Sequence, residues 1–361
     1  MNIDLLKRLC ETPGVPGREE RVRALIEAEI DGLFDSVEVD ALGSLICRRG
    51  PRSGKASKKK ATRKKAGGKD PKRVMLLCHM DEIGFYVSSI DDQGFLWINA
   101  AGGFDPRNLF SRRVTVVTDS GDLDGVMNPG GRPVHISSPE DRKKVPEVKE
   151  FFVDIGLSGA AAKKTVKVGD YIVMNEPLIE VGNKVVSKAL DNRVACWLGI
   201  EAVRKLAKSA GGHKCEVVVA FTSQEEVGLR GAQTASFGVR PDIGIGVDVT
   251  LACDTPGVPR NESVTTHGEG FALHIKDGSF ISDYELTNQI EGIAKKKRIP
   301  YQRSILAAGG QDGAAAQRAA TGAKAVGITV GTRYIHTVTE MIDRKDLEAA
   351  RDILAAYLAE A

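Results

Sequence analysis

The strongest constraint on the fold is a set of short, almost uninterrupted apolar runs that alternate with stretches of helical periodicity. The runs lie at residues 73–79, 215–222 and 243–249. Strands of this kind are buried on both faces, as in parallel sheets covered by helices. Helices of this alternation are expected at about 192–207, 282–297 and 343–359, and further strands at about 301–306 and 323–329. The pattern predicts an α/β fold with a mixed, mostly parallel sheet and helices on both faces.

Residues 85–177 have a different pattern. Short strand-like segments separated by Gly and Asp turns lie at 84–90, 95–100, 114–118 and 171–174. One helical piece is expected at 145–152. Closely spaced short strands predict a small β-rich domain. We expect it to be inserted into the α/β domain, which would consist of residues 1–84 and 178–361.

Residues 51–70 are strongly basic. They hold nine Lys and Arg residues and one acidic residue, while the whole chain has 51 basic and 48 acidic residues. The rest of the chain is therefore mildly acidic, and its charge does not indicate nucleic acid as a general partner. The segment lacks large aliphatic side chains, which predicts a disordered surface loop. Contact between this loop and nucleic acid or an anionic surface is the alternative.

The sequence disfavours a membrane-spanning or secreted protein. No run of about 18 apolar residues occurs, which excludes a membrane-spanning helix. The first residues lack the pattern of a secretory signal, so we expect none. Scattered cysteines without a C-x-x-C pair indicate reduced thiols and a cytoplasmic location. These cysteines are Cys10, Cys47, Cys78, Cys196, Cys215 and Cys253.

Five segments place an imidazole or a carboxylate at the end of a predicted strand or the start of a predicted helix. Their residues are His79 with Asp81, Asp191, Glu225 with Glu226, Asp248, and His336. Ligands of open α/β sheets bind at the carboxyl ends of the strands. Three carboxylates and two imidazoles can hold two divalent ions if one carboxylate bridges them. A ligand set without thiolates fits zinc, cobalt or manganese.

Each of these residues has an ordinary alternative when it is considered alone. Asp191 can cap the helix that follows it. Glu225 and Glu226 can be solvated loop acids, although an extended segment would point them in opposite directions. Asp248 can reach solvent from a strand end, and His336 can be a loop histidine. The remaining histidines are interpreted as surface or structural residues: His135, His213, His267 and His274.

Five motifs in order resemble the family-forty-two metallopeptidases. This family contains the glutamyl-aminopeptidase-like and tetrahedral (TET-type) aminopeptidases, some of which carry the label endoglucanase M. The motifs are Cys78–Phe85, Gly102–Pro106, Leu190–Arg193, Glu225–Gly228 and Arg333–His336. The likeness runs nearly end to end. The chain departs from it by the segment 51–70, by Gln311 in place of a Thr, and by Gly331 in place of a Pro.

The resemblance implies a metallo-aminopeptidase that removes the N-terminal residue from unblocked peptides. It implies a three-layer α/β catalytic domain interrupted by the β-rich domain, which would mediate dimerisation. A homo-oligomer is expected, either a dimer or a tetrahedral dodecamer. Glu225 would be the general base, and Asp81 would support His79, since a metal-bound imidazole usually donates its other N–H to a carboxylate.

The resemblance also implies a ligand set for two divalent ions per subunit, with zinc first and cobalt or manganese as alternatives. Asp191 would bridge the two ions. His79 and Asp248 would complete one site, and Glu226 and His336 the other.

Three other functions are alternatives to the aminopeptidase. A related dimetal amidohydrolase, such as an N-deacylase or a carboxypeptidase, would use the same core. A glycosidase, as the endoglucanase label suggests, needs a carboxylate pair but no dimetal site. A nucleic-acid-associated protein would bind through residues 51–70, but it would not need acids and imidazoles at five strand or helix ends.

Overall fold

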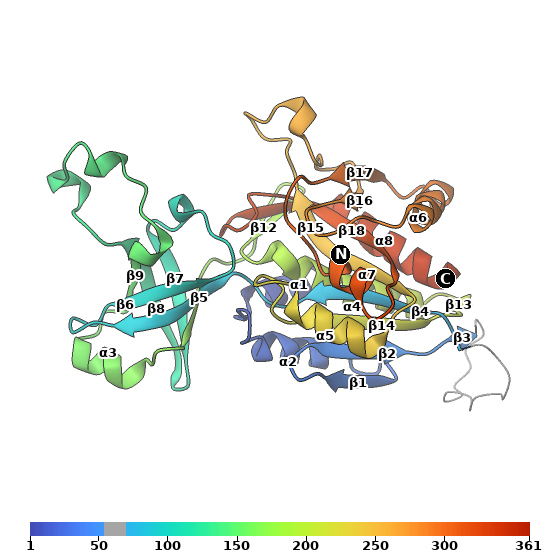
Figure 1. Ribbon diagram of the computed structural model, residues 1–361, viewed down its shortest axis with the longest axis horizontal. Coiled ribbons are helices and arrows are strands. Elements are labelled where there is room, and N and C mark those ends of the chain that lie inside the picture. Colours follow the sequence, from blue (N-terminus) through green and yellow to red (C-terminus); the bar gives the residue numbers. More distant parts are fainter. Residues whose placement is uncertain (54–69) are drawn as a thin grey trace.

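The computed structural model describes residues 1–53 and 70–361. An eleven-stranded mixed sheet with helices on both faces lies beside a closed six-stranded barrel (Figure 1). This arrangement confirms the predicted α/β fold with a smaller β-rich part. The loop predicted at 51–70 falls almost entirely on residues 54–69, which are outside the described residues.

The centre of the sheet consists of four parallel strands built from the apolar runs. They are, in spatial order, β14 (Glu216–Thr222), β4 (Arg73–His79), β15 (Ile243–Leu251) and β18 (Lys324–Arg333). The mostly parallel pattern therefore holds at the centre, while the flanking strands pair in antiparallel fashion. The flanks are β1 (Ser36–Val39) and β2 (Leu45–Arg49) on one side, and β19 (Glu340–Asp343), β12 (Lys184–Ser187) and β11 (Ile179–Val181) on the other.

Two further strand pairs complete this part of the molecule. Strand β16 pairs with β18 and with β17, and β3 pairs with β13. Their bounds are β16 (Phe271–Lys276), β17 (Tyr301–Ile305), β3 (Arg52–Ser53) and β13 (Gly212–His213). The predicted strands at 301–306 and 323–329 are confirmed, the second extended to Arg333.

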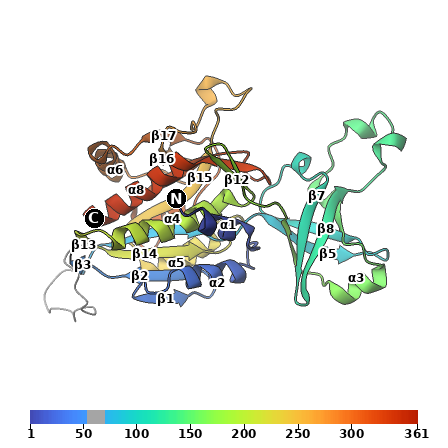
Figure 2. The same ribbon diagram turned by 180° about the vertical axis from the view of Figure 1, so that it is seen from behind.

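The two faces of the sheet are covered differently. Large apolar side chains pack one face against five helices, of which Figure 2 shows α4 and α8 most clearly. These helices are α1 (Ile3–Glu11), α2 (Glu20–Glu29), α4 (Leu190–Ala207), α6 (Tyr284–Lys297) and α8 (Arg344–Glu360). The other face carries α5 (Arg230–Val239) and α7 (Gly313–Arg318), packed largely through alanines. Among the described residues, no helix is long and apolar enough to cross a membrane.

Small residues allow α7 to approach the sheet closely. A Cβ atom added at Gly244 would lie 2.6 Å from the Cβ of Ala316, and one added at Gly246 would overlap the side chain of Gln311. A larger residue at either position would push α7 away from β15. The short distance brings the start of α7, with Asp312, beneath the carboxyl ends of the central strands.

The barrel is formed by the segment between β4 and β11 in the chain. Its strands are β5 (Gly84–Ile90), β6 (Leu96–Ala101), β7 (Arg112–Thr118), β8 (Gly121–Pro129), β9 (Phe151–Asp154) and β10 (Tyr171–Met174), with helix α3 (Gly159–Thr165) beside them. Short 3₁₀ turns lie at Pro106–Asn108, Val134–Ile136, Asp141–Lys143, Val148–Glu150 and Arg260–Glu262, the last outside the barrel. The barrel has its own apolar core, separate from that of the sheet.

The helix predicted at 145–152 is wrong. A single 3₁₀ turn at Val148–Glu150 leads directly into β9. The apolar spacing of Val145, Val148 and Phe151 resembles a helix, but the side chains of β9 alternate between buried and half-buried, which is the period of a strand. The barrel helix lies later in the chain, at Gly159–Thr165.

A buried arginine ties the N-terminal segment to the sheet. Arg193 in α4 has no exposed surface, and it donates to the backbone carbonyls of Leu9, Thr12 and Gly14. Its Nη2 also lies 3.3 Å from Glu82 Oε1, and Lys188 Nζ lies 2.6 Å from Glu82 Oε2. A buried charge remains stable only when it is paired and hydrogen-bonded, so these contacts depend on one another.

Replacement of Arg193 by leucine should therefore destabilise the fold by about 3–5 kcal/mol, because it leaves Glu82 and several carbonyls without their partner. Chemical unfolding followed by circular dichroism measures this. The exposed Arg107, which pairs with Asp105, supplies the control. Arg107→Leu should leave the unfolding midpoint nearly unchanged. Equal midpoints for the two variants would contradict the structural role of Arg193.

Candidate metal centre

The residues singled out in the sequence converge at the carboxyl edge of the parallel strands. His79 ends β4, Asp248 lies in β15, and Asp191 lies at the start of α4. The other members follow strands: Asp81 after β4, Glu225 and Glu226 after β14, and His336 after β18. Parallel strands place their carboxyl ends at one edge, which explains how residues so distant in sequence meet there.

The first part of the cluster surrounds His79. Its Nε2 atom lies 3.2 Å from Asp191 Oδ1, 3.8 Å from Glu225 Oε2 and 4.0 Å from Asp248 Oδ1. The imidazole and Asp248 are buried. Asp248 is therefore not a strand-end acid that reaches solvent.

The second part surrounds His336. Its Nε2 atom lies 3.4 Å from Asp191 Oδ2 and 3.4 Å from Glu226 Oε2. The two oxygens of Asp191 thus face two different imidazoles. Asp191 does not cap α4, because the side chain of Asn192 accepts the hydrogen bond from Ala195 N instead.

Asp81 supports both His79 and the Glu225–Glu226 pair. Its Oδ1 lies 3.5 Å from His79 Nδ1, and its two oxygens accept the backbone N–H groups of Glu225 and Glu226 at 3.1 Å each. The sequence suggested an extended segment for this pair, but the pair does not lie in one. It opens a turn, with hydrogen bonds from Gly228 N and Leu229 N back to Glu225 O.

The electrostatics of the cluster are dominated by burial and by opposing charges. Burial raises the pKa of Glu225 and of Asp248 well above their usual values, although His79 opposes the rise in both. Burial lowers the pKa of His79 and of His336, but the surrounding carboxylates outweigh it. The pKa of His79 is held well above its usual value, and the contact with Asp191 helps to raise that of His336 to about 11.

The cluster fits divalent metal ions. Ligand atoms lie within 4.8 Å of one another in three groups: His79–Asp191–Asp248, His79–Glu225–Glu226 and Asp191–Glu226–His336. The first and third share Asp191. Glu226 Oε1 is buried and has no hydrogen-bond partner within residues 1–53 and 70–361, as expected of an atom that can accept a cation. Oxygen and imidazole donors without thiolate suit zinc and similar ions.

The histidines interpreted as surface or structural stay outside these groups. His213, His267 and His274 are buried and hydrogen-bonded within the fold, and His135 is exposed. None of them belongs to a ligand group among the described residues.

Two buried acids near the cluster were missed by the sequence analysis. Glu340 accepts the backbone N–H of Asp191 at 3.0 Å and that of His336 at 2.7 Å. Asp312 contacts the hydroxyl of Thr222, and burial raises its pKa to about 6. In the sequence, Glu340 is marked only by its position four residues after His336. Asp312 is marked only by its position in the Gly-Gly-Gln-Asp segment.

Comparisons with known proteins agree with the fold and the site. A family model described as M42 glutamyl aminopeptidase matches residues 61–353. A putative aminopeptidase of Acetivibrio thermocellus is 37% identical over 352 residues, covering 97% of this chain and 96% of the relative.

Solved structures are similar over nearly the whole chain. The TET aminopeptidase of Thaumarchaeota archaeon SCGC AB-539-E09 has a TM-score of 0.90 and 34% identity, covering 99% of this chain and 95% of that one. The TET1 peptidase of Pyrococcus horikoshii, described as assembling into a tetrahedron or a large octahedral shell, has a TM-score of 0.85 and 30% identity, covering 99% of both chains.

The fold and the site together define a metal-dependent hydrolase. Because the family model matches most of this chain, the chain belongs to the M42 glutamyl aminopeptidase family, as the sequence motifs predicted. It is a metallo-aminopeptidase, an enzyme that hydrolyses peptide bonds.

The position of Glu340 generates a prediction about metal affinity. In Glu340→Gln the amide oxygen can still accept one of the two backbone N–H groups. The amide NH₂ group would face the second N–H, and two donors repel each other. The segments that carry Asp191 and His336 should then separate, and metal affinity should fall about 10- to 100-fold. Competition with a fluorescent zinc chelator measures this without an activity assay.

Asp346 in α8 provides a matched control, because it is also buried and accepts two backbone N–H groups, from Gly268 at 2.8 Å and Gly270 at 2.7 Å. Asp346→Asn should lose stability but keep its metal affinity. A Glu340→Gln protein that binds zinc as tightly as the Asp346→Asn protein would show that Glu340 does not position the ligands.

Proposed function

We propose that this chain removes the N-terminal residue from unblocked peptides, with Glu225 as the group that moves the proton. The observation that carries the proposal is the position of Asp191, whose two oxygens face His79 and His336 at 3.2 and 3.4 Å. A carboxylate shared in this way suits a bridge between two cations.

Five residues would hold the ions. Asp191 would be shared, His79 and Asp248 would complete one site, and Glu226 and His336 the other. Two divalent ions, zinc first and cobalt or manganese as alternatives, would polarise the scissile carbonyl and acidify water when bound.

This ligand set leaves two carboxylates of the cluster free, Glu225 and Asp81, and Asp81 is already engaged by the backbone N–H groups of Glu225 and Glu226. The carboxylate of Glu225 lies next to His79, at the edge of the ligand cluster. A carboxylate so placed can accept a proton from water and deliver it to the leaving amine, a step worth about 10²–10⁴-fold in rate. The second ligand group, His79–Glu225–Glu226, includes Glu225, however, so a role of Glu225 as a metal ligand is the competing assignment.

Two substitutions separate these assignments. Glu225→Gln should retain two metal ions per subunit and lose nearly all turnover of aminoacyl anilides, by about 10²–10⁴-fold, since the amide cannot accept the proton. Asp191→Ala should lose bound metal, because both sites share this residue. Metal content by atomic emission and turnover are measured on the same samples. Loss of metal from Glu225→Gln would make Glu225 a ligand, and retained activity would exclude it as the proton carrier.

A substrate with a free N-terminus is the proposed target, because a free α-ammonium complements the excess of carboxylates in the cluster. The enzyme should therefore cleave Leu-Ala-Ala and leave N-acetyl-Leu-Ala-Ala intact, and a chelator should abolish the cleavage. Mass spectrometry of the products measures both. Release of acetate would instead indicate an N-deacylase, and release of the C-terminal residue a carboxypeptidase. Cellulose hydrolysis that persists with the chelator would support the endoglucanase label.

We propose a homo-oligomeric assembly on the strength of the similar TET structures, with the barrel as the dimerisation domain. The boundaries 1–84, 85–177 and 178–361 belong to this proposal and are supported by the order of the barrel strands. Light scattering distinguishes a dimer from a dodecamer.

We also propose a cytoplasmic location, which the six unpaired cysteines support. Zinc is proposed as the native metal. Nucleic acid is not proposed as a partner.

A further inference from the structure

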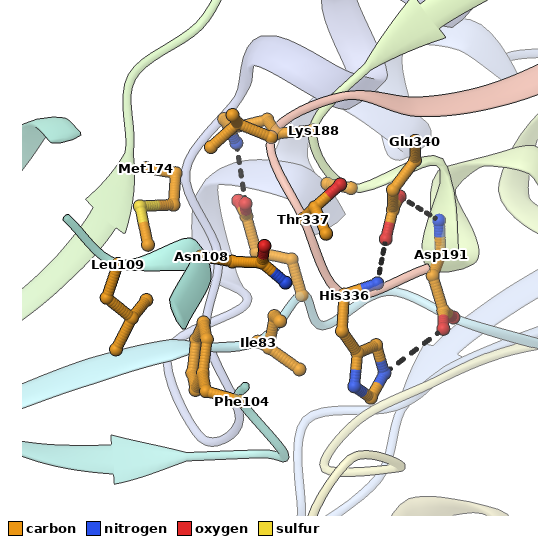
Figure 3. Close-up of a pocket in the computed structure, with 13 residues that line it drawn as sticks. Ile83, Phe104, Asn108, Leu109, Met174, Lys188, Asp191, His336, Thr337 and Glu340 are labelled. Atoms are coloured by element: carbon orange, nitrogen blue, oxygen red, sulfur yellow. Dashed lines mark hydrogen bonds and ion pairs between the residues drawn. The ribbon is translucent and has the colours of Figure 1, made fainter. Parts of the chain in front are cut away.

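Buried carboxylates outside the candidate ligand set hold the backbone around the cluster. Figure 3 shows one of them, Glu340, which accepts the backbone N–H groups of Asp191 at 3.0 Å and of His336 at 2.7 Å. Glu19, the residue before α2, is another, and it is only 3% exposed. It reaches the turn that carries Glu225, although it is about 200 positions away in the chain.

A single oxygen of Glu19 joins two distant segments. Glu19 Oε1 accepts the backbone N–H of Gly17 at 2.8 Å and that of Gln224 at 2.9 Å. Gln224 directly precedes Glu225, whose own N–H is accepted by Asp81 at 3.1 Å. Two buried carboxylates therefore hold successive N–H groups at the start of the turn.

The backbone of Gln224 needs such support. Its φ angle is +55°, in the left-handed region that a residue with a Cβ atom adopts only at a cost. Its carbonyl accepts the N–H of Arg230 at 3.2 Å, so the residue is held on both of its backbone groups. Without the bond from Glu19, Gln224 could relax toward an ordinary conformation, and this rotation would displace the side chain of Glu225.

Glu19 is itself held in place from the barrel side. The hydroxyl of Tyr86 in β5 donates to the carbonyl of Pro16 at 2.6 Å. The guanidinium of Arg18 lies over the ring of Tyr171 in β10, 4.8 Å from its centroid. These contacts fix the residues on either side of Gly17, so the carboxylate of Glu19 extends from a firm support.

We propose that Glu19 is a positioning residue for the reaction, whose carboxylate oxygen fixes Gln224 and thereby the place from which Glu225 moves the proton. The inference rests on the proposed function, in which Glu225 is the proton carrier. Because Glu19 is buried, it acts through the turn and not on the substrate. The place of its oxygen is what matters, and its charge is not required.

Two substitutions separate the place of the oxygen from the charge. Glu19→Gln keeps an oxygen at the same length, and since both N–H groups bond one oxygen, the amide can accept both. Burial raises the pKa of Glu19 to about 7, and the nearby Asp81 adds to the rise, so a neutral group suits this site. Glu19→Asp keeps the charge but withdraws the oxygen by one methylene. A positioning role predicts more activity for the Gln variant, and a need for charge predicts the reverse.

Turnover of Leu-Ala-Ala and of Leu p-nitroanilide is measured on the same zinc-saturated samples. The amine that leaves the peptide is strongly basic and must be protonated as it departs, whereas p-nitroaniline is only weakly basic. The ratio of the two kcat values therefore reports proton delivery and is independent of the active fraction.

Glu19→Asp should lower kcat on the peptide about 10- to 100-fold, because a small displacement of a reacting group costs this much. The ratio of kcat on the peptide over kcat on the anilide should fall at least about threefold. Bound zinc and KM should stay near their wild-type values. Glu19→Gln should keep both kcat values within about threefold of the wild type.

Glu11 provides the matched control, because its Oε1 also ties two distant segments by accepting the backbone N–H of Leu178 at 2.9 Å. Glu11→Asp makes the same chemical change away from the turn and should keep the wild-type ratio. Should Glu19→Asp fail to fold, Glu19→Met removes the acceptor at a similar volume and should show the same fall in the ratio.

Three results would overturn the role of Glu19 and leave the aminopeptidase function intact. They are a wild-type ratio in Glu19→Asp, an equal fall in Glu11→Asp, and a Glu19→Gln enzyme as slow as Glu19→Asp. A wild-type protein that cleaves neither substrate would instead overturn the proposed function, and the positioning role with it.

Discussion

Burial of several carboxylates within a few ångströms of one another is the constraint on which this structure depends. A buried carboxylate is costly unless it is paired or hydrogen-bonded. The inner carboxylates, Asp191, Glu226 and Asp248, face the imidazoles of His79 and His336. Their negative charge exceeds what two imidazoles can balance. This excess is the physical reason that the site suits cations, and also the reason that the surrounding chain must be held firmly.

A second set of buried carboxylates holds the segments that carry the first set. Asp81 accepts the N–H groups of Glu225 and Glu226, and Glu340 accepts those of Asp191 and His336. Glu19 accepts the N–H of Gln224 at 2.9 Å, and burial raises its pKa to about 7. Charge-assisted bonds to backbone N–H groups are stronger than neutral ones, so they fix loops that helices and strands do not hold.

The sequence predicted the fold where a single physical pattern dominates. The apolar runs of β4, β14 and β15 are buried on both faces, and their ends place His79 and Asp248 at one edge. Helices α5 and α7 were missed because they are short and pack through alanines, which leave no strong apolar period. The position of α7 depends on Gly244 and Gly246 in a distant strand, and such a close approach cannot be read from a local pattern.

The same distinction applies to the site. The candidate ligands were predictable, since His and carboxylates at strand ends stand out against apolar neighbours. Glu340 was not, because its role lies in bonds to the backbone of residues up to 149 positions away. A hydrogen bond to a backbone N–H imposes no requirement on the identity of the residue that donates it. Only the assembled structure shows that Glu340 lies between Asp191 and His336.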